Sequence, residues 1–296
     1  MEVRQLKIFA KAAETLNFSE ASKQLYITQS TLTQTIKQLE EELGVKLFDR
    51  NSHEVYLTEA GSELLAHVDS VISEIEECKA RILDLSNLRR GKLSIGVTHS
   101  FAMLNTEVVA EFCEQYPKIK IEIVYKCMGE LLLMLQRHEL DYVLSYKPSY
   151  EMPQIDSEIL FHDRLGVIVR RDHPLAERKR VSIRELDQYG LVLPAKGMQT
   201  RNVLDRILDK QDVQLKTRVE MNNVTTMMRL VRGSKMLTFA SCTSTDNYPD
   251  LVAVPLEDEG SEMIGCFHTL KGTYRKQAVE EMQDIIKRYI YCYGLE

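Results

Sequence analysis

The sequence predicts an α + α/β chain in three parts, and three patterns support this. Residues 1–57 carry short runs of helical spacing and then two short apolar runs, typical of a helix-turn-helix with a two-stranded hairpin. Residues 58–90 carry an apolar seam of period 3.5, typical of a long dimerisation helix. Residues 91–296 alternate strand-like and helix-like runs, which predicts an α/β domain, and their number predicts two lobes.

The composition is that of an ordinary globular chain. Of 296 residues, 44% are hydrophobic and 28% are charged, and no apolar run reaches the ~18 residues of a membrane span, so no membrane partner is expected. The first residues lack a signal-peptide pattern. The six cysteines lie far apart without a C-x-x-C pair, which excludes the usual zinc spacings and predicts reduced thiols. A cytoplasmic protein without a metal or other cofactor is expected.

The first part predicts three helices and a hairpin. An apolar series of helical spacing marks the first helix: Leu6, Phe9, Ala13 and Leu16. Ser19 is placed to cap a second, short helix. The third begins near Thr28 and closes at Gly44 in the left-handed conformation. Its buried stripe is expected to be Leu32, Ile36, Leu39 and Leu43. The runs VKLF and VYL around DRNSHE predict two short strands.

One long helix is expected next. Its apolar positions are spaced 4, 3, 4, 3, 4, 3 and are Leu64, Val68, Val71, Ile75, Cys78, Ile82 and Leu85. About 30 helical residues would span ~45 Å, which is longer than a small domain can cover. Packing on its own domain is the alternative, but the seam more readily needs a second copy, so a homodimer is expected.

The third helix has the character of a helix that enters a major groove. Its first turns carry short donors and acceptors opposite the apolar stripe: Gln29, Ser30, Thr31, Thr33 and Gln34. Glutamine can pair with adenine, serine and threonine suit several bases or phosphates, and Lys37 further along would reach backbone phosphate. Taken alone, this turn is equally compatible with a solvated helix that begins with capping residues.

The surrounding residues resemble the N-terminal signature of LysR-type transcriptional regulators. The matching stretches are NFSEAS, TQSTLTQTIKQLEEELGVKLFDR and VYLTEAG, and RDHPLA and LVAVPL follow in the third part. The resemblance implies a winged helix-turn-helix, a long dimer helix and a two-lobed effector domain similar to periplasmic binding proteins. It implies a double-stranded DNA operator, assembly as a homodimer and then a homotetramer, and a small-molecule effector as partners. RNA polymerase is a further candidate partner.

The resemblance also implies a wing that contacts DNA, but the net charge of the first part does not favour DNA binding. The wing contact falls on His53, where the family often has Arg, and Arg50 and Lys46 could form a positive rim with Lys37. Residues 1–50 hold seven basic and seven acidic side chains, so this part lacks the positive charge that DNA binding usually shows. Modest affinity of a single domain is expected, and several domains in one oligomer would add their contributions.

Effector residues are expected between the lobes, where strands end and helices begin. The first lobe should span about 91–161 plus 269–296 and the second about 162–268. The candidates are Thr98, Ser100, Cys127, Met128, Gly129, Tyr146, Gln199, Thr200, Asn222 and Thr225. Tyr146 is expected to form an apolar wall, and Lys196 and Arg201 are the nearby cations. Neutral donors and helix N-termini of this kind suit a small organic acid or another small anion.

Other classes of function receive less support. The sequence has no G-x-S-x-G, no H-E-x-x-H and no phosphate-binding glycine loop, so an enzyme is not expected. A thiol-based redox sensor is the first alternative, but the region 195–212, where the peroxide-responsive branch of the family has its reactive pair, contains no cysteine; Cys127 alone would remain. A solute-binding protein is the second alternative, and it would need a signal peptide.

Overall fold

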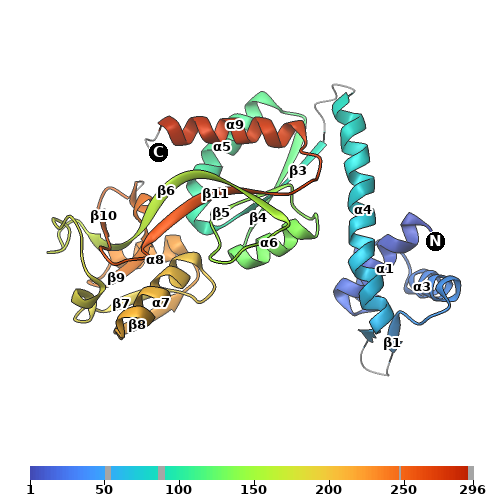
Figure 1. Ribbon diagram of the computed structural model, residues 1–296, viewed down its shortest axis with the longest axis horizontal. Helices are drawn as coiled ribbons and strands as arrows, with labels where there is room; N and C mark the ends of the chain where they lie inside the picture. Colours follow the sequence, from blue (N-terminus) through green and yellow to red (C-terminus); the bar gives the residue numbers. More distant parts are fainter. Residues whose placement is uncertain (51–54, 86–90, 247, 293–296) are drawn as a thin grey trace. The chain divides into compact units, whose positions relative to one another are not determined.

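The computed structural model describes residues 1–50, 55–85, 91–246 and 248–292, which form two compact units, Met1–Asn87 and Leu88–Glu296 (Figure 1). Within the described residues, no helix is both long enough and apolar enough to cross a membrane.

The first unit is a helix-turn-helix with a hairpin and a long helix. Its elements are α1 (Val3–Thr15), α2 (Phe18–Gln24), α3 (Gln29–Leu43), β1 (Phe48–Arg50), β2 (Val55–Leu57) and α4 (Glu59–Leu85). Strands β1 and β2 pair antiparallel. The helices meet around the rings of Phe9, Phe18 and Phe48, whose centroids lie 5.2–5.5 Å apart in the two contacts with Phe48. Asn17, and not Ser19 as expected, caps α2: its side chain accepts hydrogen bonds from the amides of Ser19 and Glu20.

The ends of α3 lie where the sequence predicts them. Thr28 Oγ1 accepts the amide of Thr31 at 3.1 Å, and Gly44 closes the helix with φ 71°. Leu32, Ile36 and Leu39 are fully buried, but Leu43 is 40% exposed because it lies in the last turn, beyond the helices that cover the others.

The apolar seam of α4 divides into two parts. Its beginning packs on α1, where Val68 is buried and Leu64 contacts the core of this unit. Further along, Val71 is 40% and Ile82 is 61% exposed. The expectation of one continuous intermolecular seam is therefore wrong for its first turns, which contribute to the chain's own core.

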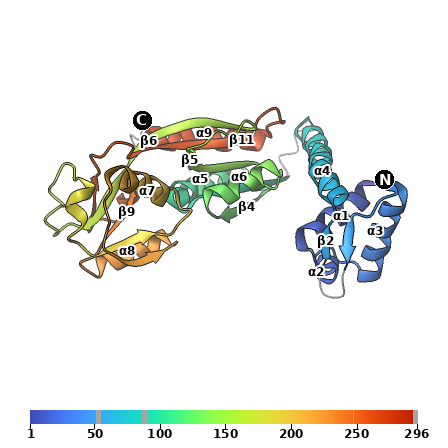
Figure 2. The same cartoon turned by 60° about the horizontal axis from the view of Figure 1, so that its bottom comes forward.

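The second unit is a nine-stranded sheet system with helices on its faces (Figure 2). Its strands are β3 (Gly91–Val97), β4 (Ile119–Tyr125), β5 (Tyr142–Tyr146), β6 (Ile155–Arg170), β7 (Leu191–Pro194), β8 (Thr217–Met221), β9 (Leu237–Ser241), β10 (Leu251–Pro255) and β11 (Glu262–Leu270). Its helices are η1 (His99–Phe101), α5 (Ala102–Gln115), α6 (Met128–Gln136), η2 (Ile183–Leu186), α7 (Gln199–Gln211), α8 (Val224–Arg232), η3 (Cys242–Thr245) and α9 (Gln277–Cys292).

Two long strands connect the halves of this unit. The order β4-β3-β5-β11-β6-β9-β7-β8 places parallel strands at both ends, and β10 pairs with β6. Strand β6 pairs with β11 as far as Arg164 and with β9 from Leu165 onward. Strand β11 also pairs with β5 from Gly265 to His268, so we count it with the first half. We call β3–β5, β11, α5, α6 and α9 the first half and β7–β10, α7, α8 and η3 the second half.

Candidate functional site

The polar turn of α3 lies on the surface of the first unit. Gln29, Ser30, Thr31 and Gln34 are exposed and Thr33 is half-buried. The hydroxyl of Thr28 lies 2.9 Å from that of Ser30 and 2.8 Å from that of Thr31, so these hydroxyls take part in capping the helix. The exposed amides of Gln29 and Gln34 are therefore the best placed of this set to reach base edges.

Two cations near this turn were expected to contact DNA. Lys37 Nζ lies 3.4 Å from Glu41 Oε1, with side chains 69% and 63% exposed. An exposed pair of this kind contributes little, so Lys37 can exchange Glu41 for a phosphate. Arg50 is the last residue of β1, but its side chain and the whole of His53 lie outside the described part of the chain.

Glu40 has a role that the sequence did not reveal. Its side chain is 5% exposed, and Oε1 accepts the amides of Leu47 at 2.9 Å and Phe48 at 3.3 Å, while Oε2 lies 3.3 Å from Lys46 Nζ. Glu40 therefore fixes the start of the hairpin to α3. The signal was present, because Glu40 follows Ile36 by four residues and so falls on the buried stripe.

The expected effector residues of the first half lie at the ends of β3, β4 and β5. The amide and the hydroxyl of Thr98 both reach the carbonyl oxygen of Leu144, at 3.0 and 3.4 Å, which ties the end of β3 to β5. Ser100 lies half-buried in η1. Cys127 is the N-cap residue of α6, with Met128 buried and Gly129 half-buried in its first turn.

The second half brings its candidates against these positions. Gln199, the first residue of α7, donates from Nε2 to the carbonyl of Lys147 at 2.9 Å. A Cβ at Gly197, where φ is +90°, would lie 3.9 Å from the Cys127 sulfur. The N-terminal ends of α6 and α7 therefore converge, and neither N-cap side chain accepts a hydrogen bond from the first-turn amides.

The remaining candidate residues of the second half differ in how exposed they are. The amide of Ala195 donates to the carbonyl of Met221 at 2.9 Å, which places exposed Asn222 beside the loop before α7. Thr225 is exposed in the first turn of α8, whereas Thr200 in α7 is only 3% exposed.

Two residues differ from their expected roles. Tyr146 is 2% exposed, so it belongs to the core and does not form an open wall, and its hydroxyl donates to Asp163 Oδ2 at 2.9 Å. Arg201 is 11% exposed and pairs with Asp205 at 2.6 Å and Glu220 at 2.9 Å. Two carboxylates neutralise its guanidinium, so Arg201 is not a free cation for a ligand.

Three cysteines of this unit have a thiol pKa above its ordinary value. Burial, with a smaller contribution from the charge of Glu130, raises the pKa of the Cys127 thiol. Burial also raises the pKa of Cys242 to about 12 and that of Cys266 to about 11. The thiolate is the reactive form, so these environments do not favour a redox role.

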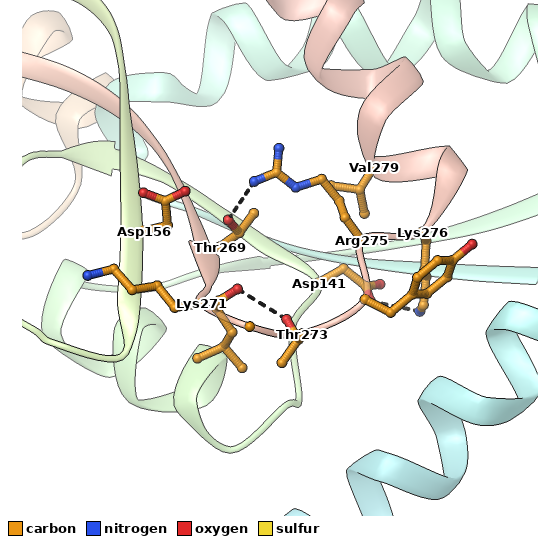
Figure 3. Close-up of a pocket in the computed structure, with 11 residues that line it drawn as sticks. Asp141, Asp156, Thr269, Lys271, Thr273, Arg275, Lys276 and Val279 are labelled. Atoms are coloured by element: carbon orange, nitrogen blue, oxygen red, sulfur yellow. Dashed lines mark hydrogen bonds and ion pairs between the residues drawn. The ribbon is translucent and has the colours of Figure 1, made fainter.

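A cavity of about 220 Å³ lies elsewhere, in the first half at the start of α9 (Figure 3). Lys276 Nζ lies 2.7 Å from Asp141 Oδ1, and Arg275 donates to Thr269 at 3.0 Å and Gln283 at 3.1 Å. Lys276 thus has a carboxylate partner, and Arg275 has a hydroxyl and an amide oxygen as partners. None of the expected effector residues lines this cavity.

Comparison with known families matches both units. The model described as "LysR substrate binding domain" matches residues 86–290, and that described as "Bacterial regulatory helix-turn-helix protein, lysR family" matches residues 3–62. The HTH-type transcriptional activator CmpR of Synechocystis is 26% identical over 242 residues, covering 82% of this chain and 79% of CmpR.

Solved structures share the fold. A full-length OxyR from Pseudomonas aeruginosa, solved as a point variant, superposes with a TM-score of 0.73 at 20% identity, over 97% of this chain and 95% of that one. The regulatory domain of Synechocystis CcmR, in complex with 2-PG, superposes with a TM-score of 0.61 at 19% identity, over 68% of this chain and 97% of that domain. The expected fold class is confirmed: a helix-turn-helix unit followed by a LysR-type substrate-binding domain.

Proposed function

The chain belongs to the LysR family of bacterial transcriptional regulators, and from this premise we propose that it is a sequence-specific DNA-binding regulator controlled by a small organic acid or similar anion. The observation that supports the second part best is the convergence of the α6 and α7 N-terminal ends at Cys127 and Gly197. First-turn amides and the helix dipole favour a negative charge there.

DNA recognition is proposed to follow from α3. The exposed amides of Gln29 and Gln34 would read base edges in the major groove of an operator, and Lys37 with Arg50 would contact phosphates. The chain is proposed to act as a homodimer that assembles to a tetramer, so that several weak DNA-binding units engage one operator together.

Base and phosphate contacts should separate on mutation. Gln29→Ala should cost ~1–3 kcal/mol at one base position and relax the preference there, because a bidentate pair is lost. Lys37→Ala should weaken binding evenly across sequences and reduce its salt dependence, because one phosphate contact fewer releases fewer counterions. Affinities for a set of single-base operator variants at two salt concentrations check this. Identical profiles for the two variants would contradict the assigned roles.

Effector control is proposed to be a shift between two arrangements of the halves. Donors of both halves face the convergence point, so a ligand held there binds the closed arrangement better than the open one. The effector changes DNA binding through this difference in affinity, and DNA changes effector affinity by the same factor.

A small organic acid should stabilise the chain against heat. At a hundredfold excess over its dissociation constant the gain is ~2.7 kcal/mol. Replacing Ser100 with Ala and Thr200 with Val removes one hydroxyl from each half and should abolish the shift while DNA binding persists. A thermal-shift screen of organic acids against neutral apolar compounds measures this, with Thr226→Val, exposed on α8, as a control. Stabilisation by apolar compounds alone, or an unchanged response of the double variant, would refute the anion proposal.

A further inference from the structure

One carboxylate joins the two halves of the second unit at the point where β6 passes between them. The hydroxyl of Tyr146, at the end of β5 in the first half, donates to Asp163 Oδ2 at 2.9 Å. The hydroxyl of Thr243, in η3 of the second half, donates to the same oxygen at 2.8 Å. A single oxygen atom thus receives one donor from each half.

The surroundings of Tyr146 and Asp163 fix the geometry of this contact. Tyr146 is 2% exposed, and its ring packs edge-on against Phe101 and Phe161, with centroids 5.0 and 6.3 Å away. The other oxygen of Asp163 accepts the amide of Arg164 at 2.7 Å, which fixes the orientation of the carboxylate. Hydrogen bonds to an ionised acceptor are roughly twice as strong as neutral ones.

The neighbouring strands have the features of a hinge. Strand β6 changes partner from β11 to β9 between Arg164 and Leu165. On β11 the register shifts between Gly265 and Cys266, and a Cβ at Gly265 would lie 2.5 Å from the Phe161 ring. The Phe161 ring therefore packs directly on the backbone of β11 at the crossover, and a few strand residues there must absorb any rotation between the halves.

We propose that Asp163 is a positioning residue that latches the two halves of the second unit at a fixed angle. A hydrogen bond is lost once its heavy atoms separate beyond about 3.5 Å. Rotation of the halves about the crossover moves Tyr146 away from Thr243, so at least one of the two bonds to Asp163 breaks. The latch sets the balance between the two arrangements before any ligand binds. It goes beyond the proposed effector control, because it holds whichever ligand the chain recognises.

The latch predicts a specific pattern of effects for single and double variants. It needs both donors, because loss of either one leaves Asp163 attached to one half only. Two independent stabilising bonds would instead give effects that multiply in the double variant.

Hydrogen exchange of the full chain tests this without a ligand or an operator. Tyr146→Phe and Thr243→Val should each speed amide exchange in peptides covering residues 162–166 and 262–266 by about tenfold, the change expected for one charge-assisted bond. The double variant should exchange no faster than the faster single variant.

Two matched control variants each remove a hydroxyl of the same kind from a residue that does not join the halves. Tyr142 lies in the same strand β5, fully buried, and its hydroxyl has no hydrogen-bond partner among the described residues, so Tyr142→Phe should leave exchange unchanged. Thr245 lies in the same η3 and donates to Cys242 in its own half, so Thr245→Val should also leave exchange unchanged. If each test variant matches its control, or if the two effects multiply, the latch is refuted. If Tyr146→Phe does not fold, the comparison of Thr243→Val with Thr245→Val, both on the half-buried η3, still tests the latch.

Discussion

Replacing Val71, Ile75 and Ile82 with lysine should give a folded monomer whose operator affinity is lower by about two to four orders of magnitude. Val71 is 40% and Ile82 is 61% exposed, and both lie on the apolar seam of α4. Six cationic side chains facing one another in a dimer would oppose association, and the avidity of two linked DNA-binding units, ~10²–10⁴, would be lost. Leu64 and Val68 are left untouched because they pack in the chain's own core.

The control for this experiment is on the same helix. Ser62, Ala66 and Ser70 are exposed and lie on the opposite side of α4 from the seam. Their replacement by lysine adds the same charge, so it reports any gain in non-specific DNA affinity and should leave the dimer intact. Sedimentation equilibrium measures the mass, and fluorescence anisotropy measures affinity for a footprinted promoter fragment. A seam variant that remains dimeric would show that another surface holds the copies together.

The local signals in the sequence were sufficient for most elements. Helix α3 begins after Thr28 and ends at Gly44 as predicted, because a hydroxyl cap and a left-handed closure depend only on residues within a few positions. The cap of α2 was misplaced by two residues because Asn17 and Ser19 both suit a cap, and only the backbone conformation decides between them. The alternation of strands and helices indicated the fold class of the second unit in the same way.

The misses depend on partners far away in the sequence. Tyr146 looked like a cleft residue because it ends a strand, but its hydroxyl is used by Asp163, which also binds Thr243. Arg201 looked like a free cation because Glu220, one of its two carboxylate partners, lies on strand β8, far from α7 in the sequence. Local spacing therefore located the candidate site but could not say which of its polar groups were already engaged.

The largest effect on stability is expected at Glu40. Replacing it with alanine leaves the amides of Leu47 and Phe48 without their acceptor in a buried position. An unsatisfied buried donor costs about 1–3 kcal/mol, so Glu40→Ala should lower the free energy of unfolding of the first unit by ~2–4 kcal/mol. The start of the hairpin would detach from α3, and operator binding should fall with it.

Two further substitutions separate the hydrogen bonds from the charge. Glu40→Gln keeps one carbonyl oxygen for both amides and removes the ion pair with Lys46, whose side chain is 72% exposed, so its cost should stay below about 1 kcal/mol. Glu41→Ala removes a neighbouring carboxylate that is 63% exposed and should change stability by no more than about 0.5 kcal/mol. Urea unfolding of the full chain, with amide exchange in peptides of α3 and β1 reporting on the first unit, ranks the three variants. If the alanine variant is no less stable than the glutamine variant, the amides of Leu47 and Phe48 find another acceptor. Glu40 then does not hold the hairpin to α3.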